Sequence, residues 1–206
     1  MTAPNRSAAP WVRYGAVVVL CLLPAMVMTW QLNTGQLGPD PAKYLMQGTG
    51  EWSLRVLMLV LLAAPLAQRG WHVLFRYRRL LGLTVFAYAC LHLLLFAQVY
   101  VGWDPVILLE ELSERPYIIA GFSAWLLLLP LALTSSDAAR RYLGRRWRQL
   151  HRLVYPAAVL MWLHIVWLVR SDLGEAVVYA VAITGLLVWR VRRYRKQARR
   201  SLRYPL

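Results

Sequence analysis

Three histidines fall within or at the edge of long apolar segments, where a polar side chain is costly. His92 lies in the segment 80–101, while His151 and His164 lie in the segment 150–169. Ionisable residues inside membrane-spanning segments are rare and usually mark a cofactor or an ion path. Two neutral imidazoles that face one another supply the axial ligands of a six-coordinate b-type haem. The histidines therefore indicate a candidate haem site.

The positions of two of these histidines along their segments predict that their rings meet. His92 follows Leu80 by 12 residues, which is about 18 Å of helix. His164 follows Leu150 by 14 residues, which is about 21 Å. If both segments start at the same membrane face, the two rings lie at one level, nearer the opposite face.

The third histidine leaves two alternatives open. His151 precedes His164 by 13 residues, so it lies about 20 Å deeper and about 140° away on a straight helix. Pro156 lies between them and gives a reason for a bend. His151 is either a ligand at a second, inner cofactor site or a solvated residue among arginines.

The composition indicates an all-α integral membrane protein. Hydrophobic residues make up 59% of the 206 residues, and the mean hydropathy is +0.45. These residues form blocks long enough to cross a bilayer as helices. We expect a bundle of six transmembrane helices, at Tyr14–Trp30, Trp52–Ala67, Leu80–Val101, Tyr117–Leu133, Leu150–Val169 and Ala176–Trp189.

The charge distribution predicts the orientation of the bundle. The chain carries 24 Lys and Arg against 9 Asp and Glu, a net charge of +15. Of these basic residues, 20 fall in the segments 1–13, 68–79, 134–152 and 190–206. The positive-inside rule places those segments in the cytoplasm, so both termini are expected there. The arginines flank apolar spans and form no single basic face, which argues against nucleic-acid binding.

The spans divide the chain into three parts. We expect a cytoplasmic N-terminal tail at 1–13, a haem-binding transmembrane domain at 14–189 and a basic cytoplasmic tail at 190–206. The loops lack a glycine-rich phosphate-binding motif and are too short for a dinucleotide-binding unit. A nicotinamide cofactor or a soluble redox partner must therefore belong to another chain.

Histidines in the third and fifth spans of a six-helix unit resemble the transmembrane domain of ferric reductases and NADPH oxidases. Those proteins hold two haems with two histidines from each helix, but Arg78 stands here where the inner histidine of the third helix is expected. A narrower resemblance, to the MsrQ (YedZ) family, covers nearly the whole chain. It rests on Thr49–Trp52, Tyr77–Gly82, Arg115–Ile118 and Gly144–Tyr155.

The resemblance implies a function that the spacing does not show. MsrQ proteins lie in the bacterial inner membrane and take electrons from the quinone pool or a cytoplasmic flavin reductase. MsrQ proteins pass these electrons to MsrP, a periplasmic molybdopterin subunit that reduces methionine sulfoxide in proteins. The chain would thus be an electron-transfer subunit and not the catalytic one. The resemblance implies haem b on His92 and His164, with His151 as a further ligand, and also FMN.

Five arginines are candidates for contacts with the acidic groups of cofactors. Arg78, Arg79, Arg145 and Arg148 lie on the expected inner surface and could bind a phosphate. Arg115 lies on the outer side and could pair with a haem propionate. The alternative is that the first four are topology signals and that Arg115 is an ordinary loop charge.

Two other functions remain open from the sequence. A membrane ferric or metal reductase would use the same haem and a different acceptor. A transporter or assembly factor without haem would use the histidines for protons or metal ions, and would be expected to carry carboxylates inside its spans. The expected spans contain no Asp or Glu away from their ends, which counts against a proton-coupled carrier.

Overall fold

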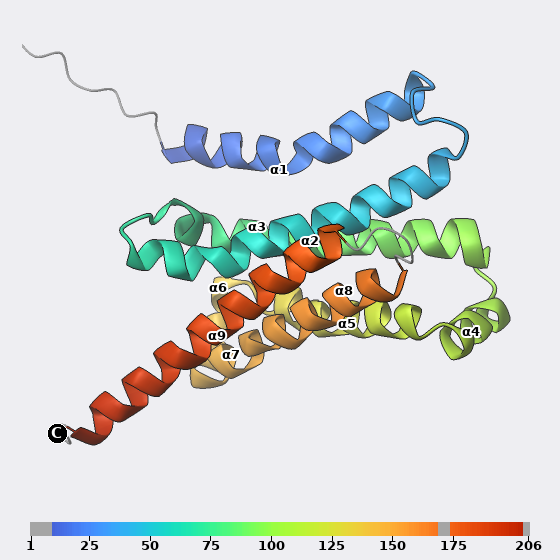
Figure 1. The fold of residues 1–206 in the computed structure, drawn as a ribbon. Helices are drawn as coiled ribbons and strands as arrows, with labels where there is room; N and C mark the ends of the chain where they lie inside the picture. Colours follow the sequence, from blue (N-terminus) through green and yellow to red (C-terminus); the bar gives the residue numbers. More distant parts are fainter. Residues whose placement is uncertain (1–9, 169–173, 204–206) are drawn as a thin grey trace, which may run out of the picture.

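The computed structural model describes residues 10–168 and 174–203, and these residues form helices joined by short turns (Figure 1). The long helices are α1 (Pro10–Asn33), α2 (Pro41–Gln68), α3 (Val73–Phe96), α5 (Pro116–Leu133), α8 (Val154–Leu168) and α9 (Gly174–Arg203). The short elements are the π-helical turn η1 (Ala97–Val101), α4 (Pro105–Glu114), α6 (Asp137–Leu143), α7 (Arg145–Leu150) and the 3₁₀ turn η2 (His151–Leu153).

Within the described residues, five helices are long and apolar enough to cross a membrane. They are Trp11–Asn33, Pro41–Gln68, Val73–Val101, Pro116–Leu133 and Arg145–Leu168. The sixth expected span, Ala176–Trp189, is helical within α9 but is not one of these five, and Arg190 follows it directly. A multi-pass helical membrane protein is therefore confirmed, whereas the sixth span remains a prediction. Val169, the expected end of the fifth span, lies outside the described residues, as do 1–9 of the N-terminal tail and 204–206 of the basic tail.

Two helices, α2 and α3, begin at least seven residues before the start that the hydropathy pattern predicted. The α2 helix starts at Pro41 and not at Trp52, because the Asp40 side chain accepts a hydrogen bond from the Lys43 N–H (3.0 Å) and caps the helix. The α3 helix starts at Val73, so much of the predicted loop 68–79 is helical. Because these helices are longer than predicted, they contain polar residues that the hydropathy pattern placed outside the spans.

Glu51 is the clearest of these residues. It lies within α2, so the expectation that carboxylates stay near the ends of the spans was wrong at this position. Its carboxylate pairs with the Arg55 guanidinium one turn later (2.8 Å), which offsets the charge of each side chain. A paired carboxylate that remains partly exposed gives no support to a proton-coupled carrier.

The basic segments gather at one end of the bundle. Figure 1 places the start of α1, the turn between α2 and α3, the helices α6 and α7 and the end of α9 at that end. The connection between α1 and α2 and the short helix α4 lie at the opposite end. The described parts of both tails are therefore on the same side, and the positive-inside rule predicts that this side is cytoplasmic.

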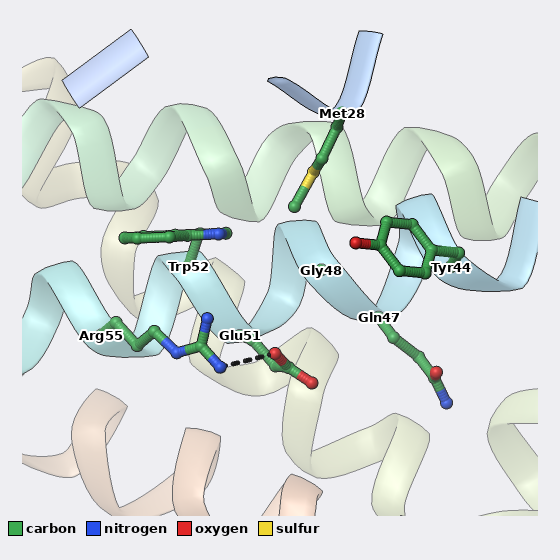
Figure 2. A pocket seen from close by; sticks show the side chains of 7 residues that line it. All are labelled: Met28, Tyr44, Gln47, Gly48, Glu51, Trp52 and Arg55. Atoms are coloured by element: carbon green, nitrogen blue, oxygen red, sulfur yellow. Dashed lines mark hydrogen bonds and ion pairs between the residues drawn. The ribbon is translucent and has the colours of Figure 1, made fainter. Parts of the chain in front are cut away.

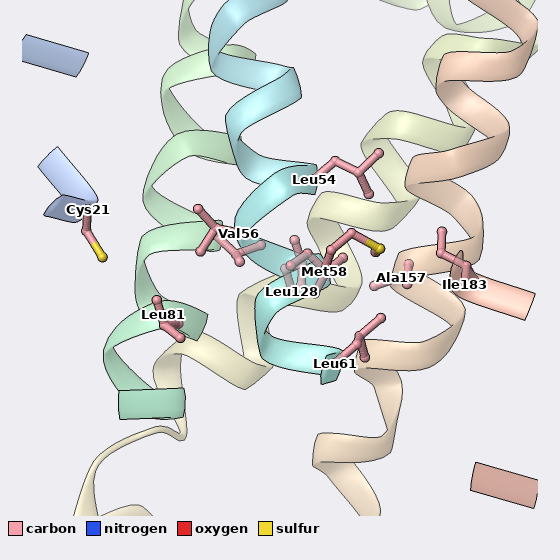
Figure 3. Close-up of a cluster of buried hydrophobic side chains, with 12 residues drawn as sticks. Cys21, Leu54, Val56, Met58, Leu61, Leu81, Leu128, Ala157 and Ile183 are labelled. Carbon is pink, nitrogen blue, oxygen red and sulfur yellow. The ribbon is translucent and has the colours of Figure 1, made fainter. Parts of the chain in front are cut away.

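The core of the bundle lies between α2, α3, α5, α8 and α9 (Figure 3). Leu54 and Leu57 of α2 are fully buried, and so are Ala157 and Ala158 of α8. Small residues let helix backbones approach closely in a membrane, where van der Waals contact takes over the role of hydrophobic burial. The α8 helix therefore uses its alanines to pack closely and so fixes the direction in which its histidine points.

Two hydrogen bonds join the α1 helix to Tyr88 of α3. The buried Tyr88 hydroxyl donates to the Cys21 carbonyl (3.0 Å) and accepts from the Ala25 N–H (3.1 Å). In a regular helix these two backbone groups pair with each other. Pro24 lies in the same turn, and Figure 1 shows α1 bending along its length. A side chain inserted beside a proline is a recognised cause of such a bend.

Tyr88→Phe is expected to loosen the attachment of α1. The ring is retained, but the hydroxyl that bridges the Cys21 carbonyl and the Ala25 N–H is lost. We expect a loss of about 0.5–2 kcal/mol of unfolding free energy, measured by denaturant titration in detergent. Tyr100→Phe is a matched control, because Tyr100 is exposed. Equal stability of wild type and Tyr88→Phe would show that the inserted hydroxyl contributes nothing.

Candidate haem site

His92 of α3 and His164 of α8 lie side by side in the bundle. Their ring centroids are 5.9 Å apart and their planes are inclined by 84°. The structure thus confirms that the two rings meet, as their depth predicted, although it does not test their role as ligands. A metal–imidazole bond is about 2 Å long, so one metal ion between the rings can bind a nitrogen of each.

A backbone carbonyl of the neighbouring helix orients each imidazole. The Nδ1 atom of His92 lies 2.8 Å from the Met46 carbonyl of α2, and the Nδ1 atom of His164 lies 2.6 Å from the Tyr117 carbonyl of α5. A carbonyl only accepts hydrogen bonds, so each Nδ1 carries the proton. The Nε2 lone pairs therefore remain available for a metal, and a carbonyl partner of this kind fixes the ring and raises its basicity.

A glycine one turn after each carbonyl makes room for the imidazole. A Cβ atom at Gly50 would lie 3.0 Å from Nδ1 of His92, and a Cβ atom at Gly121 would lie 2.7 Å from Nδ1 of His164. Glycine inside a helix is less favourable than alanine by about 0.5–1 kcal/mol. The close approach of each ring explains why glycine occupies these positions although it is less favourable in a helix.

The donor set decides which metal group the pair can hold. Within the residues that the structure describes, no group of three or more His, Cys, Asp or Glu side chains could hold a metal ion. A structural zinc ion takes four protein ligands and a catalytic one takes three. Haem brings four equatorial nitrogens of its own and needs only axial ligands from the protein. Two histidines on opposite helices, each with Nε2 available, fit haem and not a bare metal ion.

Tyr117 links this site to the N-terminal end of α5. Its ring lies 5.9 Å from that of His164, and its hydroxyl accepts a hydrogen bond from Arg115 (3.1 Å). Arg115 also pairs with Glu111 of α4 (3.0 Å). The Tyr117 hydroxyl, followed by the Glu111 carboxylate, raises the pKa of the Arg115 guanidinium above its usual value. Arg115 is therefore a permanent exposed charge, and its predicted contact with a propionate remains a prediction.

His151 occupies a different environment at the basic end. Its ring stacks on that of Trp147 (3.9 Å between centroids), and its Nδ1 lies 3.1 Å from the Trp147 carbonyl. The 3₁₀ turn η2 interrupts the helix here, because Pro156 has no N–H for the Arg152 carbonyl and its ring clashes with that carbonyl. Arg78 lies within electrostatic range of His151. Both alternatives for His151 therefore stay open.

The four arginines proposed to bind a phosphate are arranged differently from one another. Arg79 pairs with Asp137 of α6 (3.2 Å), and the Arg78 guanidinium lies over the Phe75 ring (4.1 Å). Arg145 lines an open surface hollow with Arg146, Tyr142 and Leu143. Arg148 is exposed on α7. A phosphate contact by these four arginines remains a prediction.

A small pocket of about 180 Å³ lies between α1 and α2 (Figure 2). Its polar side chains include the Glu51–Arg55 ion pair, and Met28 of α1 points at Gly48 of α2. Gly48 and Gly50 are two residues apart and so face nearly opposite sides of the helix. This pocket is therefore separate from the histidine pair.

The sequence pattern identified the two histidines but missed the residues that orient them. Gly50 and Tyr117 fall within the motifs 49–52 and 115–118, where they served only as signs of resemblance. Met46 and Gly121 gave no signal, because a carbonyl acceptor has no side-chain signature and a lone glycine in an apolar helix is common. Their contribution depends on the rotation of each helix, which hydropathy does not determine.

The chain is similar to a family of haem-binding membrane subunits. Residues 49–162 match the family model described as ferric reductase like transmembrane component. The chain is 46% identical over 179 residues to the protein-methionine-sulfoxide reductase heme-binding subunit MsrQ of Azospira oryzae, which covers 85% of this chain and 77% of that protein. It is 44% identical over 193 residues to the MsrQ subunit of Xanthomonas campestris pv. campestris (strain B100), which covers 90% of this chain and 88% of that protein. No solved structure matches the chain.

Proposed function

The chain belongs to the MsrQ family of heme-binding subunits of protein-methionine-sulfoxide reductases, and we propose that it carries electrons across the membrane through haem b. One observation supports this above all. His92 and His164 face each other at 5.9 Å, and each has its Nδ1 bonded to a backbone carbonyl and its Nε2 available. Bound haem would supply a one-electron iron couple, and His92 and His164 would be the residues that hold it.

The ligand set favours electron transfer over chemistry on a substrate. If His92 and His164 both bind the haem iron, no position would remain on the iron at which a substrate could bind. The chain is therefore proposed to be the electron-transfer subunit, with methionine sulfoxide reduced elsewhere. The names of its relatives support a methionine-sulfoxide reductase as the acceptor.

We propose that the path runs from the cytoplasmic to the periplasmic face of the bacterial inner membrane, through a bundle of six spans. The basic end would receive electrons from the quinone pool or a cytoplasmic flavin reductase. If FMN binds there, Arg78, Arg79, Arg145 and Arg148 are the candidates for its phosphate. The resemblance supports FMN, whereas the geometry favours no particular position for it.

The opposite end is suited to a soluble acceptor, the periplasmic molybdopterin subunit MsrP. His164 is in ring contact with Tyr117, whose hydroxyl reaches the exposed Arg115. The carboxylates of Glu111 and Glu114 lie within electrostatic range of Arg115. The same short helix α4 also carries Glu110, and Asp104 caps its start. Complementary charge increases the rate at which a partner docks, more than it increases affinity.

Removing charge at this end should slow docking without disturbing the haem. We expect Glu110→Gln with Glu114→Gln to lower the rate of electron delivery to the partner several-fold at low salt, with a smaller effect at high salt because ions screen exposed charges. Haem content should not change. The rate is measured by stopped-flow oxidation of the reduced haem by the partner. Arg141→Gln on α6, at the other end, is the control.

Reconstitution in vesicles tests the whole proposal. A reductant is supplied on the basic side, and the acceptor on the other side is either the partner with a methionine-sulfoxide substrate or an iron chelate. Sulfoxide reduction that requires both the chain and its partner supports the proposal. Reduction of iron chelates alone, with no transfer to the partner, would instead favour a ferric reductase.

A further inference from the structure

We propose that Gly50 and Gly121 are positioning residues that hold the two imidazoles ready to bind haem, each together with the carbonyl one turn before it. This inference rests on the proposed ligation of haem by His92 and His164. It assigns a role to two residues that carry no side chain, and it predicts that the two glycines differ in importance.

The imidazole of His164 lies closer to Gly121 than a Cβ atom at that position would allow. A Cβ atom there would lie 2.7 Å from Nδ1, 2.9 Å from Cε1 and 3.2 Å from Cγ of His164. The Nδ1 atom of His164 is at the same time held 2.6 Å from the carbonyl of Tyr117, which lies in α5 together with Gly121. A methyl group at residue 121 would therefore push the ring away from α5 and lengthen that hydrogen bond. The Nε2 atom belongs to the same rigid ring and would move with it.

The contact at Gly50 is similar but less tight. A Cβ atom there would lie 3.0 Å from Nδ1 and 3.2 Å from Cε1 of His92, while Nδ1 is held 2.8 Å from the Met46 carbonyl. A shift of a few tenths of an ångström would relieve this contact. Alanine at residue 50 should therefore disturb the site less than alanine at residue 121.

The same arrangement of a carbonyl and a glycine occurs on two separate helix pairs, α2 with α3 and α5 with α8. On α2 the carbonyl of Met46 precedes Gly50 by four residues, and on α5 the carbonyl of Tyr117 precedes Gly121 by four residues. In each case the carbonyl has two lone pairs, one for its own helix and one for the histidine. Each ring is thus oriented by its own neighbouring helix without help from the iron. Such preorganisation lowers the cost of binding.

Alanine substitutions with matched controls test this inference. Gly121→Ala and Gly50→Ala are compared with Gly82→Ala in α3 and Gly185→Ala in α9, where a new Cβ atom would meet nothing within 4 Å. The readouts are haem per polypeptide by pyridine haemochrome, the spin state from the optical spectrum, and thermal unfolding. Loss of an outer-shell partner lowers metal affinity by about 10- to 100-fold, and we expect a loss of this size for Gly121→Ala.

The spectrum separates positioning from a general loss of packing. We expect the haem that Gly121→Ala retains to be partly high-spin and five-coordinate, with added imidazole restoring the low-spin form. Gly50→Ala should fold and show a smaller change of the same kind, which keeps the test decisive if Gly121→Ala does not fold. Gly82→Ala and Gly185→Ala should resemble the wild type.

Two results would overturn the inference. One is a wild-type spectrum and haem content in the folded glycine variants, and the other is an equal loss in the controls. If His92→Ala and His164→Ala lose haem while the glycine variants do not, the positioning role fails and the ligand assignment stands. If the histidine variants keep their haem, the proposed function itself fails.

Discussion

His164→Ala and His92→Ala are each expected to lose most of the bound haem. Changes in the outer shell alone lower metal affinity by about 10- to 100-fold, so removal of a ligand should lower haem affinity by more than about 100-fold. The reason is geometric, since the described residues offer no third His, Cys, Asp or Glu beside the pair as a substitute ligand. Haem per polypeptide, measured by pyridine haemochrome in purified protein, gives the result directly.

Two further variants make this prediction specific. His72→Ala changes an exposed histidine in the turn before α3 and should leave the haem content unchanged. His151→Ala separates the two alternatives for the inner histidine. Loss of a second haem would establish an inner site, whereas an unchanged haem content would favour the alternative in which His151 is a solvated residue among arginines.

Leu54→Ala is expected to cause the largest loss of stability in the core. Leu54 is fully buried in α2, in the cluster of Figure 3. Lipid tails are as apolar as leucine, so the cost comes from the cavity and the lost contacts and not from transfer out of water. We expect a loss of about 2 kcal/mol or more in unfolding free energy, measured by denaturant titration in detergent.

Leu59→Ala on the same helix is the matched control. Leu59 is 40% exposed in the bundle and faces the surroundings, so its replacement should cost about 0.5 kcal/mol or less. Equal losses for both variants would mean that the core between α2, α3, α5, α8 and α9 does not determine stability. Because α2 also carries Met46 and Gly50, a looser α2 should release haem more readily as well.

The sequence predicted the features that depend on position along a helix. Apolar block length identified five helices that are long and apolar enough to cross a membrane. With both segments starting at one membrane face, the rise per residue predicted that His92 and His164 lie at one level, and their rings do meet. The ends of two spans were less predictable. Hydropathy placed the start of the second span after Glu51, but the Asp40 cap and the Glu51–Arg55 pair let the helix begin at Pro41.

The features that depend on helix rotation could not be predicted. Which face of α2 meets α3 decides that Gly50, and not Gly48, approaches a histidine. The carbonyls of Met46 and Tyr117 are available to any neighbour, and only the packing of α3 and α8 assigns each one to an imidazole. The insertion of the Tyr88 hydroxyl between Cys21 and Ala25 is likewise a result of packing.

The coordination of the iron tests the central claim most directly. Near-infrared magnetic circular dichroism of the purified, oxidised protein reports both the spin state and the identity of the axial ligands. Two imidazole ligands on low-spin, six-coordinate iron are predicted for the wild type. A protein that purifies without haem, or whose iron is bound by anything other than two histidines, would contradict the assignment of His92 and His164.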